Sequence, residues 1–138
     1  MSRALDGWRE LAAWLELWSD LSAEQRAAII AAVAWLGRRL HEAGQVHGCF
    51  YPKHVFLREA GGCFEACLID LEKTRPLLLG RRDRVKDLEA LVRRADAWGE
   101  AEVRELLAGY LGQARESREV SDWLAQMGRR RRTKERNQ

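Results

Sequence analysis

Two stretches in the middle of the chain decide the fold: HGCFYPKHVFL at residues 47–57 and CLIDLEKTR at residues 67–75. Each combines chemically versatile polar side chains with a short apolar run. The run at residues 55–58 predicts one strand, and the alternation over residues 63–69 predicts the returning strand. The Gly61-Gly62 pair between them is typical of a hairpin turn. We therefore expect one short β-hairpin in the middle of the chain.

Helical patterns flank this hairpin. Before it, apolar residues recur about every 3.6 positions over residues 5–18. Ser22 and Gln25 form a capping-box pattern that predicts a long helix over residues 23–43, and Gly44 is expected to end it. Three further apolar stripes follow the hairpin, led by Val85, Val103 and Val120. The fold class is therefore mainly α with one short β-hairpin.

Length and composition favour one domain in a reducing compartment. The 138 residues are 46% hydrophobic, enough for a modest core. The longest apolar run, residues 27–37, falls short of the roughly 20 residues that a membrane-spanning helix needs. Residues 1–6 lack the apolar stretch of a secretory signal. Three cysteines without disulfide-scaffold spacing add to the expectation of a cytoplasmic protein, with peripheral binding at the inner membrane as a further option.

The net charge of +3 comes from the carboxy-terminal end. Residues 129–136 hold six basic side chains and one acidic, which leaves 18 basic and 20 acidic residues elsewhere. This balance argues against a nucleic-acid-binding face. We expect a folded domain over residues 1–127 and a basic disordered tail over residues 128–138. Attraction of Arg129–Arg136 to anionic lipid is the alternative to a simply solvated end.

The hairpin should bring two polar side chains together. His54 precedes the first strand and Asp70 follows the second, so we expect them to lie close in space. A loop, a short hairpin and then an Asp is the arrangement with which phosphotransferases hold magnesium. The alternatives are a turn-capping Asp and a structural His. Zinc is disfavoured, because Cys63 and Cys67 on one strand would lie about 13 Å apart.

The same residues resemble a kinase catalytic loop and its metal-binding segment. In that pattern His47 falls on the loop His, Cys49 on the catalytic Asp, His54 on the metal-binding Asn, and Asp70 on the metal-binding Asp. Together the two stretches resemble the InaA branch of the lipopolysaccharide kinase (Kdo/WaaP) family, over residues 4–112.

The resemblance implies the C-terminal lobe of a protein-kinase-like fold, with the N-terminal lobe absent. Complete members would transfer the γ-phosphoryl group of ATP to a sugar hydroxyl of the lipopolysaccharide core. Mg and ATP are therefore the implied cofactors. The implied partners are a separate or missing N-terminal lobe and a lipopolysaccharide core precursor. The chain contains no Gly-rich loop or strand Lys of the kind that positions ATP phosphates.

The resemblance also implies a role for each site residue. Asp70 and His54 would hold magnesium and face the phosphates. His47 and Asp87 would brace the loop, with Asp87 accepting backbone hydrogen bonds. Cys49 would occupy the position of the catalytic base, for which a thiol is a poor substitute. The alternatives are a buried filler for Cys49, a surface charge for Asp87, and a non-catalytic pseudokinase module or gene fragment for the whole chain.

Overall fold

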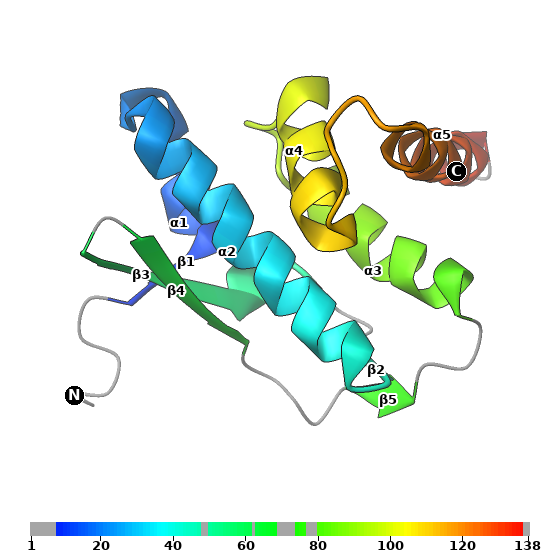
Figure 1. Cartoon of the computed structure of the whole chain (residues 1–138), viewed down its shortest axis with the longest axis horizontal. Helices are drawn as coiled ribbons and strands as arrows, with labels where there is room; N and C mark the ends of the chain where they lie inside the picture. Colours follow the sequence, from blue (N-terminus) through cyan, green and yellow to red (C-terminus); the bar gives the residue numbers. More distant parts are fainter. Residues whose placement is uncertain (1–7, 48–49, 62, 69–73, 77–79, 137–138) are drawn as a thin grey trace.

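The computed structural model describes residues 8–47, 50–61, 63–68, 74–76 and 80–136. The helices are α1 (Leu11–Glu16), α2 (Ala23–Glu42), α3 (Arg81–Arg93), α4 (Glu100–Leu111) and α5 (Arg118–Arg136), with short 3-10 helices η2 (Trp18–Asp20) and η3 (Pro52–His54). The strands are β1 (Arg9–Glu10), β2 (Gln45–Val46), β3 (Val55–Ala60), β4 (Cys63–Leu68) and β5 (Arg75–Pro76). The predicted mainly α fold is confirmed (Figure 1).

The predicted hairpin is present as β3 and β4. The two strands pair antiparallel, with Val55 opposite Leu68 at one end and Ala60 opposite Cys63 at the turn. Gly61 in the turn has a φ of +58°, a conformation that glycine adopts without strain. The hairpin therefore has the position and direction that the sequence predicts.

The prediction of one continuous helix near the amino terminus is wrong. The backbone of β1 instead adds a third strand to the hairpin, with Arg9 opposite Leu57. The following helix, α1, runs only from Leu11 to Glu16. The free edge of β3 offers hydrogen-bonding groups that β1 satisfies. A second sheet that the sequence did not predict pairs β2 with β5.

The long helix α2 forms as predicted and organises the domain. The Ser22 hydroxyl accepts the backbone N–H of Gln25 at 3.1 Å, and the Gln25 side chain accepts the backbone N–H of Ser22 at 2.9 Å. This capping box satisfies two helix-end donors. The helix ends at Glu42, and Gly44 follows with a φ of +78°.

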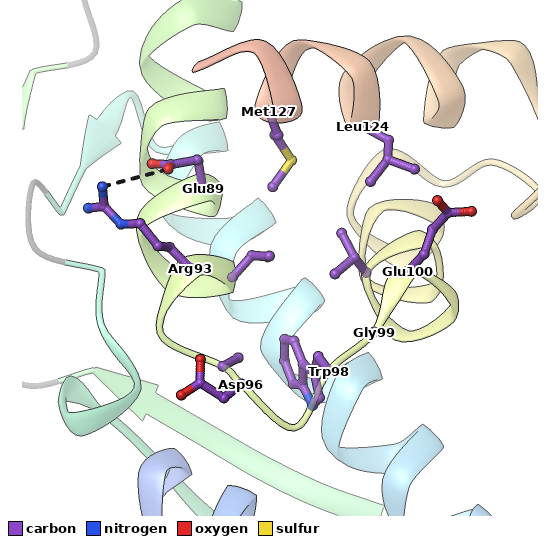
Figure 2. A pocket seen from close by; sticks show the side chains of 12 residues that line it. Glu89, Arg93, Asp96, Trp98, Gly99, Glu100, Leu124 and Met127 are labelled. Atoms are coloured by element: carbon purple, nitrogen blue, oxygen red, sulfur yellow. Dashed lines mark ion pairs between the residues drawn. The ribbon is translucent and has the colours of Figure 1, made fainter. Parts of the chain in front are cut away.

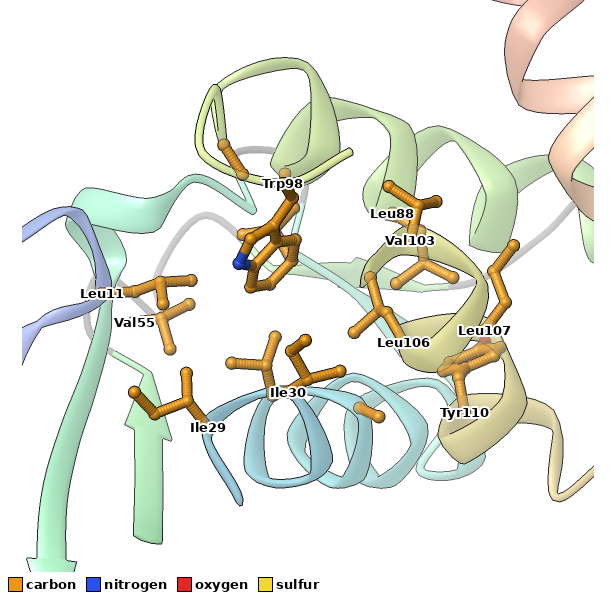
Figure 3. Close-up of a cluster of buried hydrophobic side chains, with 14 of the residues drawn as sticks. Leu11, Ile29, Ile30, Val55, Leu88, Trp98, Val103, Leu106, Leu107 and Tyr110 are labelled. Carbon is orange, nitrogen blue, oxygen red and sulfur yellow. The ribbon is translucent and has the colours of Figure 1, made fainter. Parts of the chain in front are cut away.

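The core lies on both sides of α2. The hairpin packs on one side of this helix, and α4, α3 and α5 lie on the other (Figure 1). A Cβ on Gly109 of α4 would lie 3.0 Å from the Cβ of Ala34 of α2, so glycine allows these helices to pack closely. Figure 3 shows the cluster of buried side chains where these elements meet: Leu11, Ile29, Ile30, Val55, Leu88, Trp98, Val103, Leu106, Leu107 and Tyr110.

The secondary structure at the carboxy-terminal end differs from the one that the sequence predicted. We expected order to end before residue 128, whereas α5 continues as a helix to Arg136. Arg and Lys are good helix formers, and their positive charge is favourable near a helix carboxy terminus. At the other end, the Ser117 hydroxyl accepts the backbone N–H of Val120 at 3.2 Å. The division of the chain into residues 1–127 and 128–138 remains a prediction.

Candidate functional site

The candidate site centres on the segment between β2 and β3. His47 follows β2 and is fully buried. Phe50 is also fully buried, which anchors the segment in the core. Pro52 begins the 3-10 helix η3, and the backbone N–H of His54 donates to the carbonyl of Tyr51 at 2.9 Å. This turn leads directly into β3, so the hairpin holds the end of the segment in place.

Asp87 of α3 binds the start of this segment. Its Oδ2 accepts the backbone N–H of His47 at 2.8 Å, across 40 positions of sequence. The resemblance implies this kind of hydrogen bond, and the structure contains it. Asp87 is buried, so the alternative of a surface charge is wrong. Its bracing role in catalysis remains a prediction.

The same carboxylate has a second partner that the sequence analysis missed. His41, near the end of α2, places its Nε2 2.9 Å from Asp87 Oδ2 and its Nδ1 2.5 Å from the Tyr110 hydroxyl of α4. A neutral His41 with its proton on Nε2 would donate to Asp87 and accept from Tyr110. Asp87 therefore connects α2, α3, α4 and the loop through one buried network.

A sequence signal for His41 does exist. Ile29, Val33, Gly37 and His41 are spaced by four positions along α2, and all four are buried. A polar residue that continues an apolar stripe is expected to be buried and hydrogen-bonded.

Aromatic rings stack at the base of the loop. The His47 and His54 rings have centroids 5.5 Å apart with 30° between their planes. The Tyr51 ring stacks on the His54 ring at 5.7 Å and 20°. Both histidines are buried. This stack fixes the orientation of His54 at the start of β3.

Two predicted site residues, Cys49 and Asp70, lie outside the described residues. The strand register still constrains the sequence around Asp70. Because Leu68 pairs with Val55, the chain leaves β4 beside the point where His54 enters β3. The predicted closeness of His54 and Asp70 agrees with this register and remains a prediction.

A separate hollow of about 360 Å³ lies between α3, α4 and α5 (Figure 2). Glu89 and Arg93 form an ion pair at 3.8 Å on its α3 side, while Leu124 and Met127 reach it from α5. Of the predicted site residues that the structure describes, His47, His54 and Asp87, none lines it. This hollow is therefore distinct from the described part of the segment between β2 and β3.

The buried network gives a prediction for alkaline pH. Burial raises the pKa of Tyr110 from 10.0 to about 12, against the lowering effect of the nearby Arg84 guanidinium. The folded protein thus holds this proton more tightly than the unfolded chain does. The resulting stability is complete below pH 10 and is lost as pH rises to about 12.

We expect Tyr110→Phe to reduce this alkaline loss. The free energy of unfolding, measured by urea titration between pH 9 and about 12, should fall less steeply with pH than in the wild type. Tyr51→Phe is the matched control, because the Tyr51 ring is only half-buried and lies outside the network. Equal slopes for Tyr110→Phe and the wild type would contradict the prediction.

Comparison with known proteins places this geometry in a family. The model of the lipopolysaccharide kinase (Kdo/WaaP) family matches residues 1–110. Protein InaA of Escherichia coli (strain K12) is 39% identical over 66 residues, which cover 48% of this chain and 29% of InaA. The solved structure of WaaP in complex with acyl carrier protein matches with a TM-score of 0.75 and 25% identity, over 89% of this chain and 56% of the WaaP chain.

These matches agree with the fold and extend over its central elements. The chain thus spans about half of the solved WaaP chain and less than a third of InaA. No helix in the described part of the chain is both long and apolar enough to cross a membrane. The family match covers the segment between β2 and β3, the hairpin and Asp87. The chain belongs to the lipopolysaccharide kinase (Kdo/WaaP) family.

Proposed function

We propose that this chain is the C-terminal, catalytic-loop lobe of a lipopolysaccharide kinase-like phosphotransferase. The complete protein would transfer the γ-phosphoryl group of ATP to a sugar hydroxyl of the lipopolysaccharide core. The observation that carries the proposal is the hydrogen bond from the His47 backbone to the buried Asp87 carboxylate. It fixes the start of the loop in which phosphotransferases place their acceptor-orienting residue.

The proposed metal site uses Asp70. A carboxylate supplies the hard oxygen ligand that Mg²⁺ prefers, whereas the imidazole of His54 supplies a nitrogen that Mg²⁺ seldom takes. We therefore assign Asp70 to magnesium and His54 to hydrogen bonding with a phosphate oxygen. When bound, magnesium would neutralise charge on the phosphates. The His47 and Tyr51 rings that pack against His54 support its fixed orientation.

A nucleotide site needs residues in addition to Asp70 and His54. Kinases cover ATP with a Gly-rich loop and a strand-borne Lys, and we assign these parts to an N-terminal lobe. A solved relative that is longer than this chain supports the assignment, since the match covers 56% of the WaaP chain. On this proposal, residues 1–138 alone would not transfer phosphate at a measurable rate.

One residue favours a second candidate function. Cys49 stands where kinases have the Asp that orients and deprotonates the acceptor hydroxyl. A thiol cannot take this proton, and a thiolate is a weak hydrogen-bond acceptor. The alternative is therefore a non-catalytic pseudokinase module that binds a lipopolysaccharide precursor or a protein partner.

Replacing Asp70 tests the proposed metal site. Mn²⁺ takes oxygen ligands like Mg²⁺, and its unpaired electrons broaden the NMR signals of nearby amides. We expect Mn²⁺ to broaden the amide signals of His54, Val55 and Leu68 in residues 1–138, and Asp70→Asn to abolish this broadening. Glu65→Gln, which removes an exposed carboxylate from the same hairpin, should leave it unchanged. Broadening that survives in Asp70→Asn would refute the assignment.

A further inference from the structure

A second hollow lies directly beside the catalytic-loop segment. It has a volume of about 330 Å³ and is lined by Ala12, Tyr51, Pro52, Lys53 and Arg94. Tyr51 lies two positions after Cys49, the proposed base position. The hollow is large enough for one sugar unit with a phosphate group, since small-molecule pockets begin at about 300 Å³.

Arg94 is held on one wall of this hollow. Its guanidinium carbon lies 3.8 Å from the centre of the Tyr51 ring, and its Nη1 donates to the carbonyl of Ala90 at 3.2 Å. The Tyr51 ring in turn stacks on the ring of the buried His54. These contacts hold the guanidinium in position while leaving most of its five N–H donors available.

The charged side chains among the described lining residues are both positive. Lys53 and Arg94 both line the hollow, and the described lining residues include no carboxylate. Neither side chain forms an ion pair with a described residue, whereas the neighbouring Arg93 pairs with Glu89 at 3.8 Å. Two cations beside an aromatic ring favour an anionic ligand, and the planar guanidinium fits the oxygens of a phosphate group.

We propose that this hollow binds a phosphate group carried by the acceptor sugar. The inference rests on the proposed kinase function and adds a preference for an acceptor that is already phosphorylated. Arg94 and Lys53 would hold that phosphate beside the Tyr51 ring, in the segment between β2 and β3. The phosphates of the nucleotide are the other possible source of this chemistry. None of the described lining residues belongs to β3 or β4, the strands that lead toward residue 70 in the sequence, so we assign the hollow to the acceptor.

The test is a binding titration of residues 1–138 with glucose 6-phosphate, glucose and ATP, followed by ¹⁵N NMR. We expect glucose 6-phosphate to shift the Arg94 Nε–H signal and the Tyr51 and Lys53 amides, and glucose to shift none of them. Arg94→Gln should weaken binding about tenfold, since a hydrogen bond to a charged group contributes about 1.5–3 kcal/mol. Lys53→Gln should weaken it by a smaller factor.

Arg39→Gln is the matched control. Arg39 also lies over an aromatic ring, with its guanidinium carbon 5.6 Å from the centre of the Trp35 ring on α2. Arg39→Gln removes the same charge at a position that is not among the described lining residues, so binding of glucose 6-phosphate should not change. Equal weakening by Arg39→Gln and Arg94→Gln would mean that general charge attracts the ligand, and would overturn the proposal.

Two further outcomes separate this inference from the proposed function. ATP binding that needs Arg94 and displaces glucose 6-phosphate would assign the hollow to the nucleotide and overturn the acceptor site. Unchanged spectra with glucose 6-phosphate would also overturn it. Because the titration involves no phosphoryl transfer, Arg94-dependent binding supports the site even if the complete protein proves inactive. Inactivity would count against the proposed function alone.

Discussion

Asp87→Ala is expected to lower the free energy of unfolding by about 3–5 kcal/mol. The substitution leaves the buried His41 ring and the buried His47 backbone N–H without the acceptor that both now share. Each orphaned donor costs roughly 1–3 kcal/mol. A loss of this size is a large part of the roughly 5–15 kcal/mol that stabilises a typical domain. Urea unfolding monitored by circular dichroism measures it.

Two variants control this experiment. Asp96→Ala removes an exposed carboxylate from the turn after α3 and should change stability by less than about 0.5 kcal/mol. Asp87→Asn keeps an acceptor oxygen and should lose less stability than Asp87→Ala does. If Asp87→Ala and Asp96→Ala unfold at the same urea concentration, the buried network does not hold the loop.

Cys49→Asp is expected to raise kcat for phosphoryl transfer about 10²-fold in a protein that carries both lobes. A positioned general base contributes roughly 10²–10⁴-fold to such a step. An Asp at residue 49 would restore the group that accepts the hydroxyl proton. The rate is measured as transfer of labelled phosphate from ATP to lipopolysaccharide.

The matched control is Cys63→Asp, which places the same new charge at an exposed position of β4. It should leave the rate unchanged. If Cys49→Asp has no more effect than Cys63→Asp, residue 49 does not act on the acceptor. The non-catalytic binding module would then describe the chain better than the kinase does.

Local sequence signals predicted the elements that local interactions specify. The capping box of Ser22 and Gln25 forms within four residues, so its pattern reveals the start of α2 without tertiary information. The hairpin is similar, because Gly61 sets its turn and alternation sets its register. Both elements therefore appear where the sequence predicts them.

Elements that depend on distant partners were missed. Arg9 and Glu10 lie in a stretch whose apolar residues have helical periodicity, yet they pair with β3 as a strand. The pair formed by β2 and β5 has only two residues on each side, too few to produce a pattern. In both cases the tertiary partner, and not the local propensity, decides the conformation.

The residues of the candidate site also divide into those that the sequence predicted and those that it did not. Resemblance to a kinase loop led to Asp87 and to its hydrogen bond with His47, which the structure contains. His41 and Tyr110 were missed because their contact joins α2 to α4 across 69 positions. The roles of Cys49 and Asp70 remain predictions, since both residues lie outside the described ranges.

The central claim is that this chain supplies the catalytic loop of a kinase that phosphorylates lipopolysaccharide. The most direct test is to join this chain to an N-terminal kinase lobe and to incubate the two-lobe protein with labelled ATP, Mg²⁺ and lipopolysaccharide. Our account predicts slow incorporation of label into the core sugars, which Asp70→Asn abolishes and Cys49→Asp accelerates. Absence of label with both the wild type and Cys49→Asp would contradict it.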